Sequence, residues 1–256
     1  MKEKILELLK ENREGFISGE KISDKFDVSR AAIWKYMNAL REEGYNIESV
    51  PSKGYRLIST PDILTYEEIK EYLDTNYIGR NIYYFDTIDS TNIKAKTLAV
   101  NGEKEGTVVI AEEQTAGRGR LGRNWVSPKG KGIWMSIILR PKVDPMKVAK
   151  VTQVGAGAMS LALDDLEMDS CIKWPNDIVI DGKKVCGILT EMSCELNMIN
   201  YVIMGIGINV NLDKEDFEGE VSKVGTSLKI VSGEEQDRKK LLSLFLNRFE
   251  SFLNRF

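Results

Sequence analysis

The first sixty residues carry three short helical patterns of apolar positions, each followed by a turn signal. The first apolar face is formed by Ile5, Leu6, Leu8 and Leu9. Ser18 is expected to cap a second helix over residues 19–26, and Ser29 a third helix over residues 30–44. Two strands then alternate around a basic hairpin tip at residues 51–54. This order of elements predicts a winged helix-turn-helix.

The third of these helices begins with small residues and has a polar outer face, which is typical of a helix that enters a DNA groove. The candidate DNA contacts of this helix and of the hairpin tip are Ser29, Arg30, Ala31, Trp34, Lys35 and Lys53. The contact area of one monomer is small, so useful specificity is expected to require a dimer on two half-sites. A three-helix interaction module with merely solvated charges is the alternative.

From residue 81 onward, strand-like and helix-like runs are interleaved. The strand-like runs cover residues 82–88, 106–114, 132–140, 171–180, 184–192 and 201–210, and the helix-like runs cover 92–100, 147–166 and 236–256. Several strands are consecutive, which favours an α+β fold with a mixed or mainly antiparallel sheet and helices packed on one side. Residues 59–62, with Pro61, are typical of a linker. We therefore expect a DNA-binding domain over residues 1–60 and a second domain over residues 61–256.

The composition restricts the possible catalytic mechanisms more than it restricts where in the cell the protein is located. The chain has 256 residues, a net charge of −3, three cysteines and no histidine, which excludes a Ser-His-Asp triad, a Cys-His dyad and His-ligated zinc within it. Three cysteines are too few for a disulfide framework. Charges interrupt the apolar run at the amino terminus, and no apolar stretch is long enough to span a membrane. A cytoplasmic protein without membrane contact is expected, and we predict no metal site within the chain.

Residues 114–125, QTAGRGRLGRNW, form the most unusual segment. Its glycines are costly to order and its only sizeable apolar side chain before Trp125 is Leu121. An anionic ligand could order the segment by pairing with guanidinium groups and backbone N–H donors. It is not a phosphate-binding loop of the GxxxxGK[ST] type. The alternative is a flexible basic surface loop.

Four further segments carry polar groups that suit a ligand site, although each alone has an ordinary structural explanation. Residues 89–92 offer hydroxyls and an amide at the start of a helix, where they would also serve as a cap. Residues 173–177 place a lysine, an aromatic ring, an amide and a carboxylate near a turn, and Asp181-Gly182 predicts a hairpin before Lys183 and Lys184. Residues 205–211 form a strand whose two glycines leave room for something close.

Taken together and in order, DSTN, GRGRLGRNW, KWPNDI, KVCGILTE and GIGINVN behind a helix-turn-helix resemble the family of bifunctional biotin–protein ligases that also repress the biotin operon. The resemblance runs from about Ser18 to Asn211. It implies a winged helix-turn-helix followed by a catalytic domain like that of class II aminoacyl-tRNA synthetases. The implied enzyme makes biotinyl-5′-adenylate from biotin and ATP with Mg²⁺, then transfers biotin to a lysine of a biotin carboxyl carrier protein. The adenylate-loaded form is expected to form a homodimer and bind operator DNA.

The resemblance also implies roles for particular residues. The biotin head would be held by Ser90, Thr91, Asn92 and Gln114; the closing loop would contain Arg118, Gly119 and Arg120; the adenylate would be surrounded by Trp125, Asn176, Asp177 and Asn209; and Lys184 would contact the biotin carboxylate and the reacting phosphate. Lys184, Arg118 and Asp177 are thus the catalytic candidates, with Asp177 as orienting group or base in the transfer step. Leu121 departs from the second basic residue common in this loop.

The resemblance leaves three questions open for the structure and for experiment. Members of the family usually continue into a small SH3-like β-barrel, whereas this sequence stops at Phe256, as a fragment or a shortened member would. The family dimer extends the central sheet, so the strand at 186–195 or the strand at 201–210 is expected at an edge. The alternative functions are a lipoate- or octanoate-type ligase, a non-enzymatic biotin-sensing repressor, and a ligase with a vestigial DNA-binding head.

Overall fold

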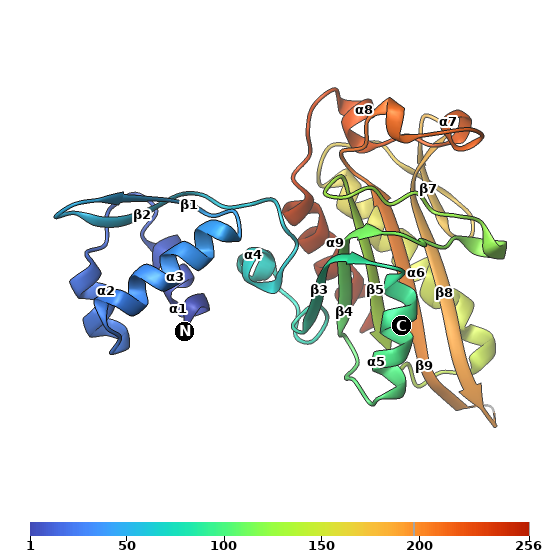
Figure 1. The fold of residues 1–256 in the computed structure, drawn as a ribbon. Coiled ribbons are helices and arrows are strands. Elements are labelled where there is room, and N and C mark those ends of the chain that lie inside the picture. The colour runs from blue at the N-terminus through green and yellow to red at the C-terminus, as the bar shows by residue number, and fades with distance from the viewer. Residues whose placement is uncertain (197, 256) are drawn as a thin grey trace. The chain divides into compact units, whose positions relative to one another are not determined.

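The computed structural model describes residues 1–196 and 198–255, and the chain divides into two compact units, Met1–Asp62 and Ile63–Phe256 (Figure 1). The division lies two residues beyond the boundary expected at residue 60. In the described ranges, no helix is both long and apolar enough to cross a membrane.

The first unit is a three-helix bundle followed by a hairpin. Its elements are α1 (Lys2–Glu11), α2 (Gly19–Phe26), α3 (Arg30–Glu42), β1 (Asn46–Val50) and β2 (Gly54–Ser59). Both predicted caps are confirmed, because the Ser18 hydroxyl accepts from Lys21 N at 3.1 Å and the Ser29 hydroxyl accepts from Ala32 N at 3.2 Å. A single apolar cluster joins the three helices to the hairpin. The predicted winged helix-turn-helix is therefore confirmed.

A seven-stranded sheet forms the centre of the second unit. Its strands are β3 (Ile82–Ile88), β4 (Val108–Gln114), β5 (Gly132–Leu139), β6 (Cys171–Lys173), β7 (Asp177–Ile180), β8 (Lys183–Glu195) and β9 (Met198–Asn209). Their order is β3-β4-β5-β9-β8-β7-β6, with β3 and β4 parallel and every other neighbouring pair antiparallel. The prediction of a mixed sheet in an α+β fold is confirmed.

Helices cover both faces of this sheet, so the prediction of helices on one side is wrong. The helices of the unit are α4 (Tyr66–Ile69), α5 (Thr91–Val100), α6 (Val148–Asp164), α7 (Val221–Val224), α8 (Leu228–Ser232) and α9 (Arg238–Leu253). The main core lies between the sheet and the pair α6 and α9, whereas α5 covers the opposite face through Ala95 and Ala99 (Figure 1). The buried face of α5 is made of small residues, and these give no strong apolar periodicity in the sequence.

Two expectations about strands also need correction. The run at 171–180 is two strands, because residues 174–176 form a turn between β6 and β7. The strand at 201–210 is not an edge, because β9 pairs with β5 on one side and β8 on the other. By contrast, β7 pairs with β8 only as far as Gly187, so the described sheet has no strand beside residues 188–195 of β8 on that side.

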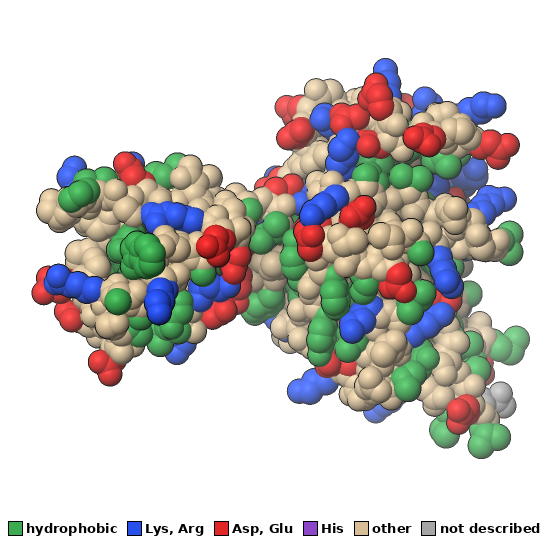
Figure 2. All heavy atoms as spheres, in the orientation of Figure 1, with side chains coloured by type: hydrophobic (Ala, Val, Ile, Leu, Met, Phe, Trp, Pro, Cys, Tyr) green, Lys and Arg blue, Asp and Glu red, His purple; other side chains and the backbone are tan. Residues whose placement is uncertain are grey.

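The surface mixes both signs of charge. Figure 2 shows Lys and Arg side chains interspersed with Asp and Glu side chains over the visible face of each unit. Exposed apolar side chains gather where β8 turns into β9, among them Met192, Leu196 and Met198 (Figure 2, lower right). Any attraction for an anionic ligand must therefore come from local groups, as the small net charge of −3 already indicates.

Candidate functional site

A cavity of about 660 Å³ lies over β8 and β9, beside the first turn of α5. This volume is within the range of small-molecule sites. The predicted site residues that line it are Ser90, Thr91, Asn92, Gln114, Arg118, Gly119, Arg120, Trp125, Asn176, Asp177 and Lys184. Asn209 is the exception, because it lines a smaller adjoining cavity of about 60 Å³ that shares Trp125 and Lys184 with the first. The fold thus gathers residues from 90 to 184 in one place.

The floor of the cavity includes three glycines of β8 and β9. Gly187 pairs with Gly207 across β8 and β9, and Gly205 pairs with Leu189. A Cβ atom at Gly205 would lie 2.1 Å from Asn92 Oδ1, and one at Gly207 would lie 2.5 Å from the Trp125 ring. The prediction that these glycines make room for a close neighbour is confirmed, since Asn92 and Trp125 rest directly on the sheet.

The closed end of the cavity is polar and internally hydrogen-bonded. Gln114 Oε1 accepts from Thr91 N at 2.9 Å and from Thr91 Oγ1 at 3.1 Å, and Gln114 Nε2 donates to Ser127 Oγ at 3.0 Å. Ser136 Oγ lies 2.8 Å from Thr91 Oγ1 and 2.6 Å from Asn92 Oδ1. Ser90 occupies the cap position of α5, but its side chain accepts no cap hydrogen bond. This end offers a fixed set of hydroxyls and amides to a polar ligand head.

Two residues at this end were missed from the sequence. Glu191 accepts from Asn92 Nδ2 at 2.8 Å and pairs with Lys96 Nζ at 2.6 Å. Burial alone would raise the pKa of Glu191, but hydrogen bonds from Lys96 and Asn92 outweigh burial and hold that pKa below its usual value. The feature of the sequence that could have identified Glu191 is the alternation of side chains along a strand, which places Glu191 on the same face of β8 as Gly187.

The open end of the cavity is cationic. Lys184 Nζ lies 2.6 Å from Asp177 Oδ1 and 5.0 Å from the centroid of the Trp125 ring. Arg120 Nη1 donates to Asn176 Oδ1 at 2.6 Å, and Asn176 Nδ2 lies 3.0 Å from Asp177 Oδ1. Within the described chain, Trp125 Nε1 is buried without a hydrogen-bond partner. Lysine, arginine and an aromatic face form a suitable environment for a phosphate attached to a flat base.

The glycine- and arginine-rich loop is ordered by its own backbone rather than by packing. Gly119 N donates to Arg123 O at 2.7 Å, and Trp125 N donates to Gly117 O at 2.9 Å. Leu121 has φ of +57° and is 90% exposed, so it adds nothing to the packing of the loop. Arg118 and Arg120 are exposed and line the cavity, and Arg120 is held toward it by its hydrogen bond to Asn176.

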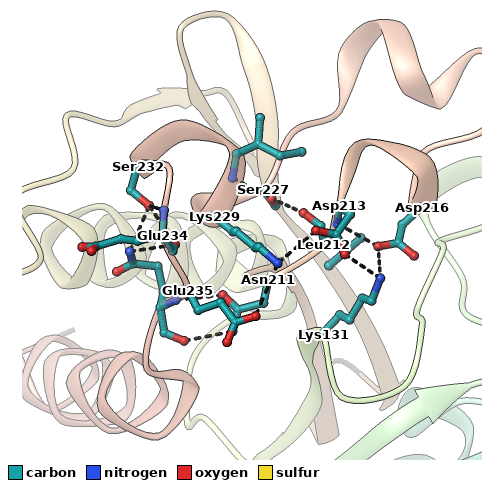
Figure 3. A network of polar contacts seen from close by, with 12 residues as sticks. Lys131, Asn211, Leu212, Asp213, Asp216, Ser227, Lys229, Ser232, Glu234 and Glu235 are labelled. Atoms are coloured by element: carbon teal, nitrogen blue, oxygen red, sulfur yellow. Dashed lines mark hydrogen bonds and ion pairs between the residues drawn. The ribbon is translucent and has the colours of Figure 1, made fainter.

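The segment after β9 forms a further wall, which contributes Val221 and Val224 of α7 to the cavity. A polar network holds the segment in place (Figure 3). Lys131 pairs with Asp213 at 2.9 Å and with Asp216 at 2.6 Å, and Lys229 pairs with Asp213 at 3.0 Å. Asn209 belongs to this support, because its Nδ2 donates to Thr226 O at 3.0 Å.

The candidate DNA contacts lie together on the first unit. Ser29, Arg30, Ala31, Trp34 and Lys35 are all exposed along the first half of α3, and Trp34 is 59% exposed. Lys53 is exposed at the hairpin tip, with Nζ 5.8 Å from the centroid of the Phe16 ring. Trp34 and the cations Arg30 and Lys35 therefore share one exposed stretch of α3.

Both units are similar to known protein families. Residues 84–209 match the model of the biotin/lipoate A/B protein ligase family, and residues 2–56 match an HTH domain. The bifunctional ligase/repressor BirA of Bacillus spizizenii is 45% identical over 251 residues, covering 98% of this chain and 77% of the relative. Its counterpart in Escherichia coli is 33% identical over 243 residues, covering 94% of this chain and 73% of the relative. The structure of biotin protein ligase from Aquifex aeolicus in complex with biotin and ATP matches with a TM-score of 0.60 and 35% identity, over 69% of this chain and 72% of the other.

Proposed function

Because the chain belongs to the family of bifunctional ligase/repressor BirA proteins, we propose that it activates biotin with ATP, transfers biotin to a lysine of a biotin carboxyl carrier protein, and represses transcription as a DNA-bound regulator. The observation that carries the proposal is a cavity of about 660 Å³ with a hydrogen-bonding closed end and a cationic open end. Biotin has a polar ureido ring at one end and a carboxylate at the other, so its two ends suit the two ends of the cavity.

The closed end favours biotin over lipoate. A ureido ring has two N–H donors and a carbonyl acceptor, and the hydroxyls of Ser90 and Thr91 and the amides of Asn92 and Gln114 can pair with them. The dithiolane ring of lipoate has no comparable groups, so it would gain none of these hydrogen bonds. We therefore propose biotin as the substrate.

In the first step, a carboxylate oxygen of biotin attacks the α-phosphate of ATP, the bond from the α-phosphorus to the β-phosphate oxygen breaks, and pyrophosphate leaves. A carboxylate is already ionised at neutral pH, so this step needs charge neutralisation and alignment rather than a general base. We propose that Lys184, Arg118 and Arg120 supply the positive charge around the phosphate. Mg²⁺ is proposed to arrive on the phosphates of ATP, because Mg²⁺ is commonly bound through substrate phosphates.

In the second step, the lysine of the carrier protein loses a proton and its amine attacks the biotinyl carbonyl carbon of the adenylate, so that an amide bond forms and AMP leaves. Asp177 is proposed to orient Lys184 in the first step, as their 2.6 Å contact supports, and to orient or accept a proton from the incoming lysine in the second. These two tasks are compatible, because Lys184 can turn toward a bound phosphate and leave the carboxylate for the incoming amine.

The proposed ligase activity predicts exchange of label between pyrophosphate and ATP that depends on biotin. The full chain should catalyse this exchange with biotin and not with lipoate or octanoate, because only biotin pairs with the polar end of the cavity. Incorporation of labelled pyrophosphate into ATP measures it. A lipoate-dependent signal would identify the other ligase class, and biotin binding without exchange would identify a non-enzymatic sensor.

The DNA-binding proposal predicts a specific change in salt dependence. Changing Lys35 to alanine should weaken binding to a duplex and reduce the slope of log K against log salt by about one, because one phosphate contact is lost. Fluorescence anisotropy of a labelled duplex with biotin and ATP present measures both quantities. Lys4→Ala, an exposed lysine of α1, is the matched control. Equal slopes for Lys35→Ala and the unchanged chain would place the DNA contact elsewhere.

We also propose a homodimer formed through β8. The support is the outer side of residues 188–195, which has no neighbouring strand in the described sheet, together with the exposed Met192. Pairing two such strands would extend the sheet across both subunits and bring two DNA-binding units together on one operator. We further propose that the protein is located in the cytoplasm. Its cysteines are free thiols, and the cytoplasm is a reducing compartment that keeps thiols free.

A further inference from the structure

Glu191 of β8 and Lys96 of α5 meet behind the closed end of the cavity. Neither residue lines the cavity, yet Glu191 is hydrogen-bonded to Asn92, which does. Lys96 Nζ lies 2.6 Å from Glu191 Oε1, and the other carboxylate oxygen, Oε2, accepts from Asn92 Nδ2 at 2.8 Å. The carboxylate therefore connects a cation on one side to a ligand-facing amide on the other.

The carboxylate determines which way the Asn92 amide faces. An ionised carboxylate only accepts hydrogen bonds, so the NH₂ group of Asn92 must point toward Glu191. The amide oxygen then faces Ser136 Oγ, which donates to it at 2.6 Å. A flipped amide would place its oxygen against the carboxylate and lose the bond to Glu191, while its NH₂ group could still donate to Ser136 Oγ. Two oxygens facing each other are costly here, because Asn92 is only 6% exposed.

The orientation of its amide group is the main conformational freedom left to the Asn92 side chain. Its side chain fills the space above Gly205, where a Cβ atom would lie 2.1 Å from Asn92 Oδ1. Lys96 fixes the carboxylate through its second oxygen and, with Asn92, keeps the pKa of Glu191 below its usual value, so the acceptor stays ionised at neutral pH. Arg118 adds a weaker attraction of the same sign.

We propose that Glu191 and Lys96 are positioning residues that select the amide orientation of Asn92 and thereby set the affinity of the cavity for the ureido ring of biotin. The inference rests on the proposed function in taking biotin as the ligand. It assigns no contact between either residue and biotin, and no part in the reaction at the phosphate.

The test compares biotin affinity with turnover in the full chain. Glu191→Gln should raise the dissociation constant for biotin about tenfold or more, because an amide can face Asn92 with either group and no longer selects one orientation. Lys96→Met should have a similar effect and Lys96→Arg should stay within about threefold of the unchanged chain. At saturating biotin, the exchange rate and the KM for ATP should change less than about twofold, because the groups at the phosphate are untouched. Calorimetry of biotin binding and pyrophosphate exchange give these values.

Lys129→Met is the matched control, because Lys129 pairs with Asp86 at 2.7 Å on an exposed surface and does not line the cavity. Biotin affinity within twofold of the unchanged chain in folded Glu191→Gln and Lys96→Met would overturn the inference. If Glu191→Gln fails to fold, the biotin affinities of Lys96→Met and Lys96→Arg alone decide the test. If the unchanged chain binds biotin but does not catalyse pyrophosphate exchange, the proposed ligase activity is refuted. The biotin affinities of the variants would still test the positioning role of Glu191 and Lys96. Failure to bind biotin at all would refute both.

Discussion

Replacing Lys184 with methionine should lower the rate of biotinyl-5′-adenylate formation by about 10²–10³-fold. Lys184 Nζ lies at the open end of the cavity, 2.6 Å from Asp177 and 5.0 Å from the centroid of the Trp125 ring, so methionine keeps the stem and removes the charge. The loss should appear in the rate at saturating substrates more than in biotin affinity, because the charge that Lys184 opposes grows as the phosphate reacts. Single-turnover formation of the adenylate measures the effect.

The neighbouring lysine gives a close control. Lys183 is exposed, does not line the cavity and precedes Lys184 on the same strand, so Lys183→Met removes the same charge from the opposite face of β8. It should leave adenylate formation within about twofold. Equal effects of the two substitutions would show that only the general positive field of this hairpin matters, and a Lys184→Met rate within about fivefold of the original would remove Lys184 from the catalytic role.

The second large effect concerns stability. Arg238→Met should destabilise the second unit by about 3–5 kcal/mol, because it leaves Glu112 buried without its partner. Arg238 Nη1 lies 2.7 Å from Glu112 Oε2 and also donates to Gly132 O at 2.9 Å, with the two side chains only 1% and 4% exposed. The pair joins the start of α9 to β4 and β5 of the central sheet. Urea unfolding followed by tryptophan fluorescence measures the loss, since Trp125, Trp134 and Trp174 all lie in this unit.

Arg248, also on α9, provides a comparison for the effect of Arg238→Met. Arg248 makes a two-pronged pair with Asp165, but those side chains are 45% and 30% exposed. Solvent screens such a pair, so Arg248→Met should cost less than about 1 kcal/mol. Combining Arg238→Met with Glu112→Gln should recover part of the lost stability by removing the unpaired charge. A similar small cost at both arginines would mean that water reaches Glu112 in solution.

Local rules predicted much of this fold. The hydroxyls of Ser18 and Ser29 cap the helices as expected, and Asp181 and Gly182 both adopt positive φ in the predicted hairpin turn. These features depend on residues close in the sequence, so a short window contains all the information they need.

The features that sequence reasoning missed depend on distant contacts. The Lys96–Glu191 pair spans 95 positions, and its two members become neighbours only when α5 lies against β8 and β9. The side of the sheet that α5 covers was also missed, because Ala95 and Ala99 are too small to mark a buried face. Asn209 was expected at the main cavity but supports the wall beside it, since its amide bonds to Thr226 after a return of the chain.

The glycine floor has a consequence for redesign of the substrate range. Gly187, Gly205 and Gly207 lie within paired strands, so the height of the floor is set by main-chain hydrogen bonds and cannot be lowered by any substitution. It cannot be raised either, because a methyl group at Gly205 or Gly207 would displace Asn92 or Trp125. Variants that accept bulkier nucleotide analogues should therefore be sought at Val221 and Val224, where the wall beside Trp125 and Lys184 is a short helix on an irregular segment.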